Sequence, residues 1–340
     1  MQHAASRCTI RVLVVVTAAL LAGGRSAAQV TTDRGASILI YPKVVADASA
    51  DTTLQLVNLS DNRIDAYCAY VSGAAGSWQA LAFNIALSPQ RPVHWTAAGG
   101  HTAAAGEDPN DIPAAPAGFR GDVLCVQVDG TGAPFSGNEL AGQALLTDVA
   151  SGDLTGYTAA GLRGSGLNDG DDNLCIGNGE SDTCFIGEYD SCPGEWIVSL
   201  PAEGAADTQL GAGSQLSTDL TVVPCSQNFR DAQPGSVDID ITVFNELGQQ
   251  FTGTASVTCW ADLSLADVGG GIFTRQTLGT DAAEARLKPM GGSGGFFLLA
   301  QTTRTSGGAA PVASSAAVVP PHQGSTDTSD LIVLPMGRPQ

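Results

Sequence analysis

The sequence predicts an all-β protein, built from two tandem β-sandwich units with an acidic, cysteine-containing loop region between them. Short runs rich in β-branched residues recur along the chain and are broken by Gly, Asp, Asn and Pro. The 42 glycines accompany a lack of the long periodic Leu, Glu, Lys and Ala stretches that are typical of helices. In addition, four strand-like segments of the first half recur in the same order in the second half.

The first 28 residues have the features of a secretory signal peptide. Arg7 and Arg11 supply positive charge, residues 12–22 form an apolar core, and small residues at 26–28 precede an expected cleavage ahead of Gln29. The apolar core is shorter than the roughly 20 residues that a membrane-spanning helix needs. We therefore expect an exported protein, secreted or at the cell surface, that is not inserted in a membrane.

Cleavage at this position leaves a strongly acidic chain. It removes three of the 15 basic residues and none of the 34 acidic ones, so the formal charge becomes −22. Lysine occurs only at Lys43 and Lys288. Such a chain repels phosphate backbones and anionic lipid, so nucleic acid and membrane surfaces are excluded as expected partners.

The first predicted unit, residues 29–160, begins with clear strand patterns. Residues 36–41 are apolar and lead into a proline, and residues 52–58 alternate apolar with polar side chains and close on an asparagine. A turn at 58–63 then leads to residues 64–72, so we expect these last two strands to pair as a hairpin. Further strands are expected at 81–87, 122–128 and 142–149.

The second predicted unit, residues 216–304, repeats this order. Residues 219–224 again end in a proline, residues 237–245 again close on an asparagine, and residues 253–260 carry a cysteine as residues 64–72 do. An alternating segment at 263–268 completes the set. The shared order favours an internal duplication over the chance similarity of alternating strands.

Each unit resembles the immunoglobulin-like β-sandwiches that are common in exported bacterial proteins. The resemblance rests on a strand ending in proline, a hairpin with Cys in its second arm and a further alternating strand, and the whole chain is similar to uncharacterised secreted bacterial proteins of this type. The Cys…Trp…Cys signature of antibody-type domains is absent. The resemblance implies a fold and a location, and it implies no activity.

The cysteines and the C-terminal composition complete the predicted organisation. Seven cysteines follow the expected cleavage point, and disulfides are the usual state of cysteines in an exported chain. We expect Cys68 to pair with Cys125 and Cys225 with Cys259. One local bridge and one spare thiol would then come from Cys175, Cys184 and Cys192. Residues 305–340 are small, polar and proline-spaced, which predicts a flexible tail.

The predicted connecting segment, residues 161–215, contains the most distinctive chemistry. Its acidic stretch, 168–192, holds seven carboxylates and three cysteines without a Lys or Arg. The cysteine spacing lacks the C-x-x-C pairs of zinc and redox sites. A possible calcium site is predicted instead, because oxygen ligands crowd around Gly170 at Asp169, Asp171, Asp172 and Asn173. The spacing fits no EF-hand, so a solvated acidic loop held by a disulfide is the alternative.

The sequence predicts no catalytic residues and, apart from the possible calcium, no cofactor. We therefore expect a non-enzymatic structural or binding protein with a protein or glycan partner that the sequence does not identify. One alternative is a secreted hydrolase whose site forms where the loops 96–118 and 168–192 face each other. The other alternative is an adhesion module that calcium stabilises.

Overall fold

The computed structural model describes residues 34–74, 78–103, 111–149, 152–177, 184, 187–207, 213–292, 294–305, 317–319, 322–323 and 328–335. The predicted signal peptide, residues 1–28, lies outside these described residues. The prediction of an all-β protein is confirmed, because nearly all of the regular structure consists of strands, arranged in four sheets. The described helical elements are short: η2 (Val268–Gly270), α1 (Arg275–Leu278) and η3 (Met290–Gly292).

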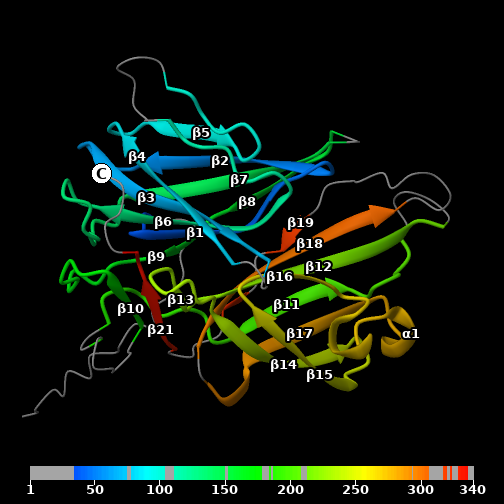
Figure 1. The fold of residues 1–340 in the computed structure, drawn as a ribbon. Coiled ribbons are helices and arrows are strands. Elements are labelled where there is room, and N and C mark those ends of the chain that lie inside the picture. Colours follow the sequence, from blue (N-terminus) through cyan, green and yellow to red (C-terminus); the bar gives the residue numbers. More distant parts are fainter. Residues whose placement is uncertain are drawn as a thin grey trace, which may run out of the picture.

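The first nine strands form one sheet that bends into two layers (Figure 1). These strands are β1 (Ile38–Ala46), β2 (Ala50–Asn58), β3 (Ile64–Ser72), β4 (Ala80–Leu87), β5 (Pro92–Thr96), β6 (Phe119–Val128), β7 (Leu140–Asp148), β8 (Leu154–Thr158) and β9 (Ala160–Leu162). The order is β4-β3-β6-β1-β2-β7-β8, with β5 beside β2 and β9 beside β1. The pair Ala46–Asp51 joins β1 to β2 at the corner between the layers.

A hydrophobic core with several large aromatic side chains fills the space between these two layers. Leu54 and Leu56 of β2 point inward from one layer because apolar residues alternate along that strand. Trp95 of β5 donates a hydrogen bond from Nε1 to the hydroxyl of Tyr70 on the opposite layer, at 2.8 Å. Phe83 packs edge-on against Trp95, with ring centroids 6.2 Å apart. The bent sheet is therefore a sandwich in its own right.

The second half forms two further sheets, which pack face to face around a second core. Their strands are β11 (Trp196–Pro201), β12 (Gln215–Pro224), β14 (Ser236–Asn245), β15 (Gln250–Thr258), β16 (Ala261–Ser264), β17 (Ala282–Pro289), β18 (Phe296–Thr305), β19 (Ala317–Val319) and β20 (His322–Gln323). One sheet has the order β15-β14-β17-β11-β20, and the other has the order β16-β12-β18-β19.

The four-stranded sheet is buried on both faces and joins the two halves. Leu298 of β18 faces the core of the second half, while Leu299 belongs to the core of the first half. On the same strand, Phe297 packs into a third core together with Ile38 and Leu124 of the nine-stranded sheet. This double burial explains the continuous apolar run in β18. The sheets are consequently stacked as layers, as Figure 1 shows.

A small third unit of structure covers the outer face of the nine-stranded sheet. It consists of β10 (Asn173–Gly177), β21 (Ser329–Val333) and β13 (Gln227–Asn228), in the order β10-β21-β13. Leu174 and Ile332 are buried in the third core. Residues 329–333 were expected to belong to a flexible tail, but their apolar side chains find a buried place against β10 that composition alone does not reveal.

The ends of the predicted connecting segment belong to the sheets on either side of it. β9 adds to the nine-stranded sheet by pairing with β1, and β11 lies between β17 and β20 in the five-stranded sheet. The acidic part in the middle packs through β10 onto the first half. The described part of residues 161–215 therefore contributes β9, β10 and β11 to three different sheets, and β12 of a fourth sheet begins at its last residue, Gln215.

Asn58 and Asn245, the residues on which the corresponding strands of the two halves close, have the same local role. Each is buried, and each accepts a hydrogen bond in the following turn: Asn58 Oδ1 from the Ser60 amide, and Asn245 Oδ1 from the Leu247 amide. Their side-chain amides donate to backbone carbonyls elsewhere, those of Leu87 and Leu278. The matching asparagines thus fix equivalent turns.

Strand pairing nevertheless differs between the halves, and one predicted hairpin is wrong. β14 and β15 pair along their length as expected. In the first half β2 pairs with β1, β5 and β7, whereas β3 pairs with β4 and β6. The turn at 58–63 carries the chain from one layer of the sandwich to the other, because both strands bury one apolar face in the same core.

Three disulfides join six of the cysteines, and two of the expectations are confirmed. Cys68 pairs with Cys125, directly opposite it on the neighbouring strand, and Cys175 pairs with Cys184 as a local bridge. The third bridge is Cys192–Cys225, so the predicted pair Cys225–Cys259 is wrong. Sequence position misled this prediction, because the acidic segment folds back and brings Cys192 beside the end of β12.

Among the described cysteines the free thiol is Cys259, so the prediction that Cys175, Cys184 or Cys192 supplies the spare thiol is wrong. Cys259 is buried, and its Sγ lies 3.5 Å from the carbonyl oxygen of Ser72 on the first half. Burial, reinforced by the nearby Asp122 carboxyl, raises the pKa of the Cys259 thiol to about 11. The thiol is therefore a packing group between the two halves rather than a reactive thiolate.

Among the described residues, no helix is long and apolar enough to cross a membrane.

The disulfide pattern makes a direct prediction about stability. Replacing Cys192 and Cys225 together by Ala is expected to lower the free energy of unfolding by about 2–5 kcal/mol, because the bridge restricts the unfolded chain. Equilibrium unfolding in urea measures this loss. The control Cys259→Ala should cost only about 1 kcal/mol, the common value for a point substitution. A loss in the control as large as in the double variant would contradict the assigned pairing.

Candidate functional site

The four residues of the predicted calcium site lie together at the start of β10. Asp169, Asp171 and Asp172 precede the strand, and Asn173 is its first residue. Gly170 has a φ of 80°, which lets the backbone turn sharply between the aspartates. The structure thus brings the predicted residues into one tight loop.

The oxygens of this loop accept hydrogen bonds from the loop's own backbone. Asp169 Oδ1 accepts from the amide of Asp171 at 3.0 Å, and Asp171 Oδ1 accepts from the amide of Asn173 at 2.6 Å. The second oxygen of Asp171 accepts from the side-chain amide of Asn173 at 2.9 Å. These are Asx turns, in which a short acidic side chain replaces a backbone acceptor. The loop is therefore organised by its own polar contacts.

Two residues that the sequence did not single out hold the loop from the other side. Glu188 accepts from the amides of Asp169 and Cys175, both at 3.0 Å, and Tyr189 accepts from the side chain of Asn168 at 2.7 Å. Burial raises the pKa of Glu188, the two amide hydrogen bonds oppose this, and the negative charges of Asp169 and Asp171 add to it. No local pattern marks Glu188, because its partners lie 13 and 19 residues away.

A basic side chain does reach the acidic loop, although the acidic stretch itself has none. Nη2 of Arg230 lies 3.8 Å from Oδ2 of Asp172. Within the described part of the chain, the one group of at least three acidic, Cys or His residues whose ligand atoms converge is Cys192, Cys225 and Asp330. The two sulfurs of that group form a disulfide, which removes them as thiolate ligands. Calcium at Asp169–Asn173 would require the aspartates to turn from their present hydrogen bonds.

The described parts of the two loops proposed to form a hydrolase site pack in different hydrophobic cores. Ile112, from the loop 96–118, belongs to the same core as Val123 of β6. Tyr189, from the acidic stretch, belongs to the same core as Leu124 of β6. Neighbouring residues of a strand point to opposite faces, so Ile112 and Tyr189 lie on opposite sides of β6. Residues 104–110 and 178–183 lie outside the described residues.

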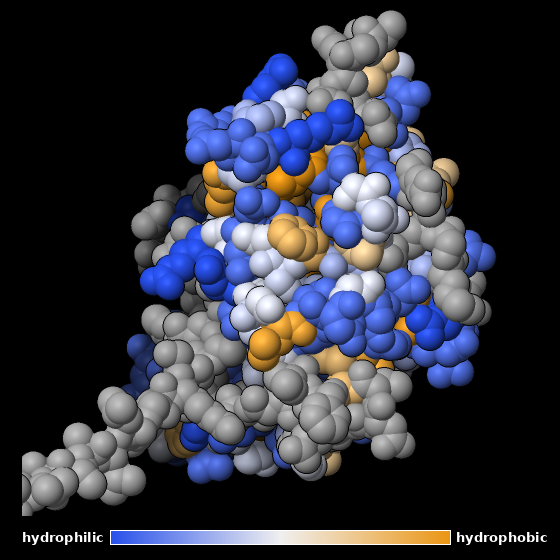
Figure 2. All heavy atoms as spheres, turned by 90° about the vertical axis from the view of Figure 1, so that its left-hand side faces the viewer, coloured by the Kyte–Doolittle hydropathy of each residue, from blue (hydrophilic) through white to orange (hydrophobic). Residues whose placement is uncertain are grey.

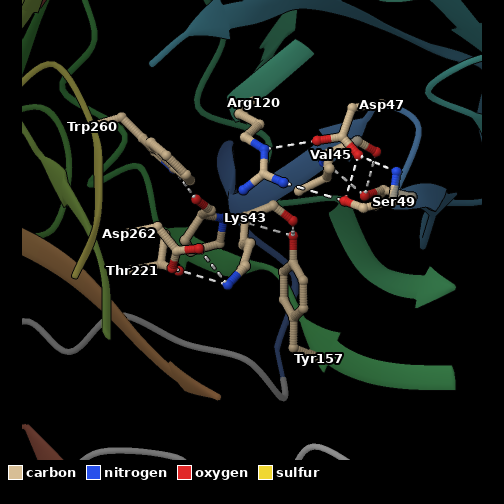
Figure 3. A network of polar contacts seen from close by, with 11 residues as sticks. Lys43, Val45, Asp47, Ser49, Arg120, Tyr157, Thr221, Trp260 and Asp262 are labelled. Carbon is tan, nitrogen blue, oxygen red and sulfur yellow. Dashed lines mark hydrogen bonds and ion pairs between the residues drawn. The ribbon is translucent and has the colours of Figure 1, made fainter. Parts of the chain in front are cut away.

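A second polar site lies where the first half meets the second (Figure 3). The register of β1 against β6 shifts between Tyr41 and Val44, so Pro42 and Lys43 form a bulge. Tyr157 donates to the carbonyl oxygen of Lys43 at 2.6 Å. Trp260 donates from Nε1 to the carbonyl oxygen of Pro42 at 2.7 Å. The bulge is therefore held from both halves.

The side chain of Lys43 crosses into the second half. Its Nζ lies 2.9 Å from Oδ1 and 2.8 Å from Oδ2 of Asp262, which stands opposite Thr221 in the four-stranded sheet. Thr221 donates its hydroxyl hydrogen to the same Oδ1 at 2.8 Å. Only 7% of the Lys43 side chain and 18% of the Asp262 side chain are exposed. Removing one partner of such a pair would leave a buried charge uncompensated.

The corner next to this bulge is held by a more exposed pair. Arg120 donates to Asp47 Oδ2 at 2.7 Å, and Asp47 Oδ1 accepts from the amide and hydroxyl of Ser49. Partial burial raises the pKa of Asp47, but the hydrogen bonds from Ser49 and Arg120 outweigh it and hold the pKa below its usual range. The arrangement fixes the turn between β1 and β2.

Asp122 is the most deeply buried carboxyl group near this interface. Its side chain is fully shielded from solvent. Neither of its carboxylate oxygens accepts a hydrogen bond within the usual distance and angle limits among the described residues. Burial raises the pKa of Asp122 well above its usual value, and the nearby side chain of Gln227 only partly opposes this. The folded protein therefore holds the Asp122 proton more tightly than the unfolded chain does.

Comparison with known proteins adds little to these sites. No protein-family model matches the chain, and no curated protein matches it. Among solved structures, it shows a likeness to the crystal structure of the PBSX exported protein XepA, with 9% sequence identity and a TM-score of 0.16. The match covers 75% of this chain and 82% of that chain. A TM-score this low supports no inference about fold or activity.

The burial of Asp122 predicts how stability changes with pH. Because its pKa is higher folded than unfolded, the folded state holds the proton more tightly, and stability decreases as pH rises from the unfolded-state pKa through the folded-state pKa. Asp122→Asn cannot ionise, so it should be more stable than the wild type at pH 8. The advantage should shrink as the pH is lowered toward 4.

Thermal unfolding between pH 4 and 8 measures this difference. The exposed Asp240, on β14, provides a matched control. Asp240→Asn should leave the shape of the pH profile close to that of the wild type. If the difference in melting temperature between Asp122→Asn and the wild type were the same at every pH, the buried-charge interpretation would be contradicted.

Proposed function

We propose that the protein is a non-enzymatic exported structural or binding protein, located at the cell surface or outside the cell. The observation that carries this proposal is the set of three disulfides among the cysteines that follow the predicted signal peptide. Disulfides persist in oxidising compartments and are rare in the cytosol. They agree with the export that the N-terminal sequence predicts.

The position of the disulfides supports a structural role. Cys68–Cys125 joins adjacent strands of the first half, and Cys192–Cys225 ties the small sheet region to the end of β12. The remaining thiol, Cys259, is buried between the halves. The bridges thus reinforce one sheet from within and tie the small sheet region to the second half, as expected of a structural role.

The polar groups at the centre of the molecule also support a structural role. Lys43, Asp262 and Thr221 bind one another across the boundary between the halves. Trp260 and Tyr157 bind backbone carbonyls at the same boundary. These contacts join layers, and each of them satisfies a group that the packing of the sheets has buried.

The surface favours a polar partner. Figure 2 shows a face on which hydrophilic residues predominate, with apolar residues in small separate patches among the described residues. Combined with the acidic charge of the chain, such a face is suited to a protein or glycan partner rather than to an apolar one. A partner of this kind would bind a rigid, disulfide-reinforced surface.

Export and activity can be tested on the secreted protein. The intact mass of the protein from the medium is expected to begin at Gln29 and to show three disulfides by the mass gained on reduction and alkylation. A panel of ester, glycan and peptide substrates should show no turnover. Turnover that is abolished by substituting a carboxylate in the loops 96–118 or 168–192 would establish the hydrolase alternative instead.

A calcium-stabilised adhesion module is the second candidate function. The observation in its favour is the concentration of aspartate oxygens around Gly170, in a loop fixed by Glu188. Calcium accepts six to eight oxygen ligands and tolerates irregular loops. The loop would bind the ion by exchanging its Asx-turn hydrogen bonds for coordination.

Calcium titration separates the two candidates. The leading proposal predicts that millimolar calcium produces no heat and no change in melting temperature, since Asp169 and Asp171 already accept backbone hydrogen bonds. Isothermal titration calorimetry and thermal unfolding with and without EDTA provide the measurements. A calcium-dependent rise in melting temperature that Asp171→Asn abolishes would establish the adhesion-module candidate.

A further inference from the structure

The chain contains only two lysines, and they are in very different surroundings. Lys288 is 42% exposed and lies 3.4 Å from Glu195. Lys43 is part of the bulge in β1, and its side chain is almost completely buried against the four-stranded sheet. We propose that Lys43 and Asp262 condense to an intramolecular amide bond, which links β1 of the first half covalently to β16 of the second half. This inference does not depend on the proposed function.

The two reacting groups are already in contact. Lys43 Nζ lies at nearly equal distances from both oxygens of Asp262, 2.8 and 2.9 Å, so the nitrogen faces the carboxyl group as a whole. Reacting groups held in this way behave as if at an effective concentration far above any in solution. β1 and β16 belong to different sheets, and the packing of those sheets holds the two groups together.

Thr221 distinguishes the two oxygens of Asp262. Its hydroxyl donates to Oδ1 at 2.8 Å. A donor in this position stabilises negative charge that develops on Oδ1 when the amine attacks the carboxyl carbon. Oδ1 is therefore the oxygen that remains as the amide carbonyl, and Oδ2 is the oxygen that leaves.

The condensation balances without an oxidant or a further reactant. The ammonium group of Lys43 gives one proton to the Asp262 carboxylate, which yields a neutral amine and a neutral carboxylic acid. The nitrogen lone pair attacks Cγ of Asp262, and a C–N bond forms. A second proton moves from nitrogen to the departing oxygen, the C–O bond breaks, and Oδ2 leaves as water.

Asp219 is placed to carry the second proton. It lies on β12 two residues before Thr221, and side chains two apart on a strand share one face. Asp262 pairs with Thr221 across the sheet, so Asp219 is its diagonal neighbour. Burial raises the pKa of Asp219, the Asp262 charge raises it further, and Lys43 lowers it. In this position the Asp219 carboxyl can accept a proton from the attacking nitrogen and pass it to the departing oxygen.

Burial also favours the condensed product. An ion pair taken out of water has to overcome the desolvation of two charges. The amide has no charge, and the water that forms can leave through the exposed side of Asp262. An ordinary buried ion pair is the alternative state of the same residues, and the two differ by the mass of one water.

Peptide mapping of the mature wild-type protein tests the proposal directly. After reduction, alkylation and unfolding, trypsin should release peptide 35–63 joined to peptide 231–275, with one water less than their sum and with no cleavage after Lys43. The joined pair is decisive because the only cysteine in it is the free Cys259. Dehydration at any other site would leave the two peptides separate. Separate peptides, with cleavage after Lys43, would overturn the proposal.

Variants assign the roles within the site. Lys43→Arg should abolish the joined pair, while the matched control Lys288→Arg should retain it in full. Asp219→Asn keeps both reacting groups but cannot carry a proton, so the joined fraction should fall at least tenfold at equal times after folding. Circular dichroism and melting temperature confirm that this variant is folded. A folded Asp219→Asn variant that is completely joined would refute the role of Asp219.

Discussion

The architecture depends on a strand that has no exposed side. All nine residues of β1 are buried, because one face of the strand lines the core of the first half and the other face lines the core shared with the second half. A polar group on such a strand must find its partner inside the protein. Lys43 does so across the boundary at Asp262, and the backbone of the bulge does so at Tyr157 and Trp260. Packing and polar contacts thus specify the same junction between the halves.

The cysteines and the acidic stretch are explained by the same layering. The small sheet formed by β10, β21 and β13 covers apolar side chains on the outer face of the nine-stranded sheet. The disulfide Cys192–Cys225 holds this region to the end of β12. Glu188 turns inward, and its two oxygens accept amides from separate parts of the acidic loop. The acidic stretch is therefore a folded part of the molecule, organised by one buried carboxylate.

Polar contacts between distant segments meet at the junction of the two halves. Ile112 of the loop 96–118 and Tyr189 of the acidic stretch pack in separate cores, on opposite sides of β6. By contrast, residues from β1, β12 and β16, far apart in sequence, meet at Lys43 and Asp262. The proposed amide bond between Lys43 and Asp262 would hold one half of the molecule covalently to the other, which suits the proposed structural role.

Local residue patterns by themselves predicted the all-β class, most strand positions, the asparagines on which matching strands close, the bridge Cys68–Cys125 and one local bridge among Cys175, Cys184 and Cys192. Alternation and turn chemistry are short-range properties, so a single sequence reveals them. Only the tertiary structure decided which strands pair, that residues 329–333 form a buried strand and that Cys225 joins Cys192. It alone also showed that Glu188 holds the acidic loop and that Lys43 pairs with Asp262 across the junction. These outcomes depend on contacts between segments many residues apart, and many alternative pairings satisfy the same local pattern until the layers are packed together.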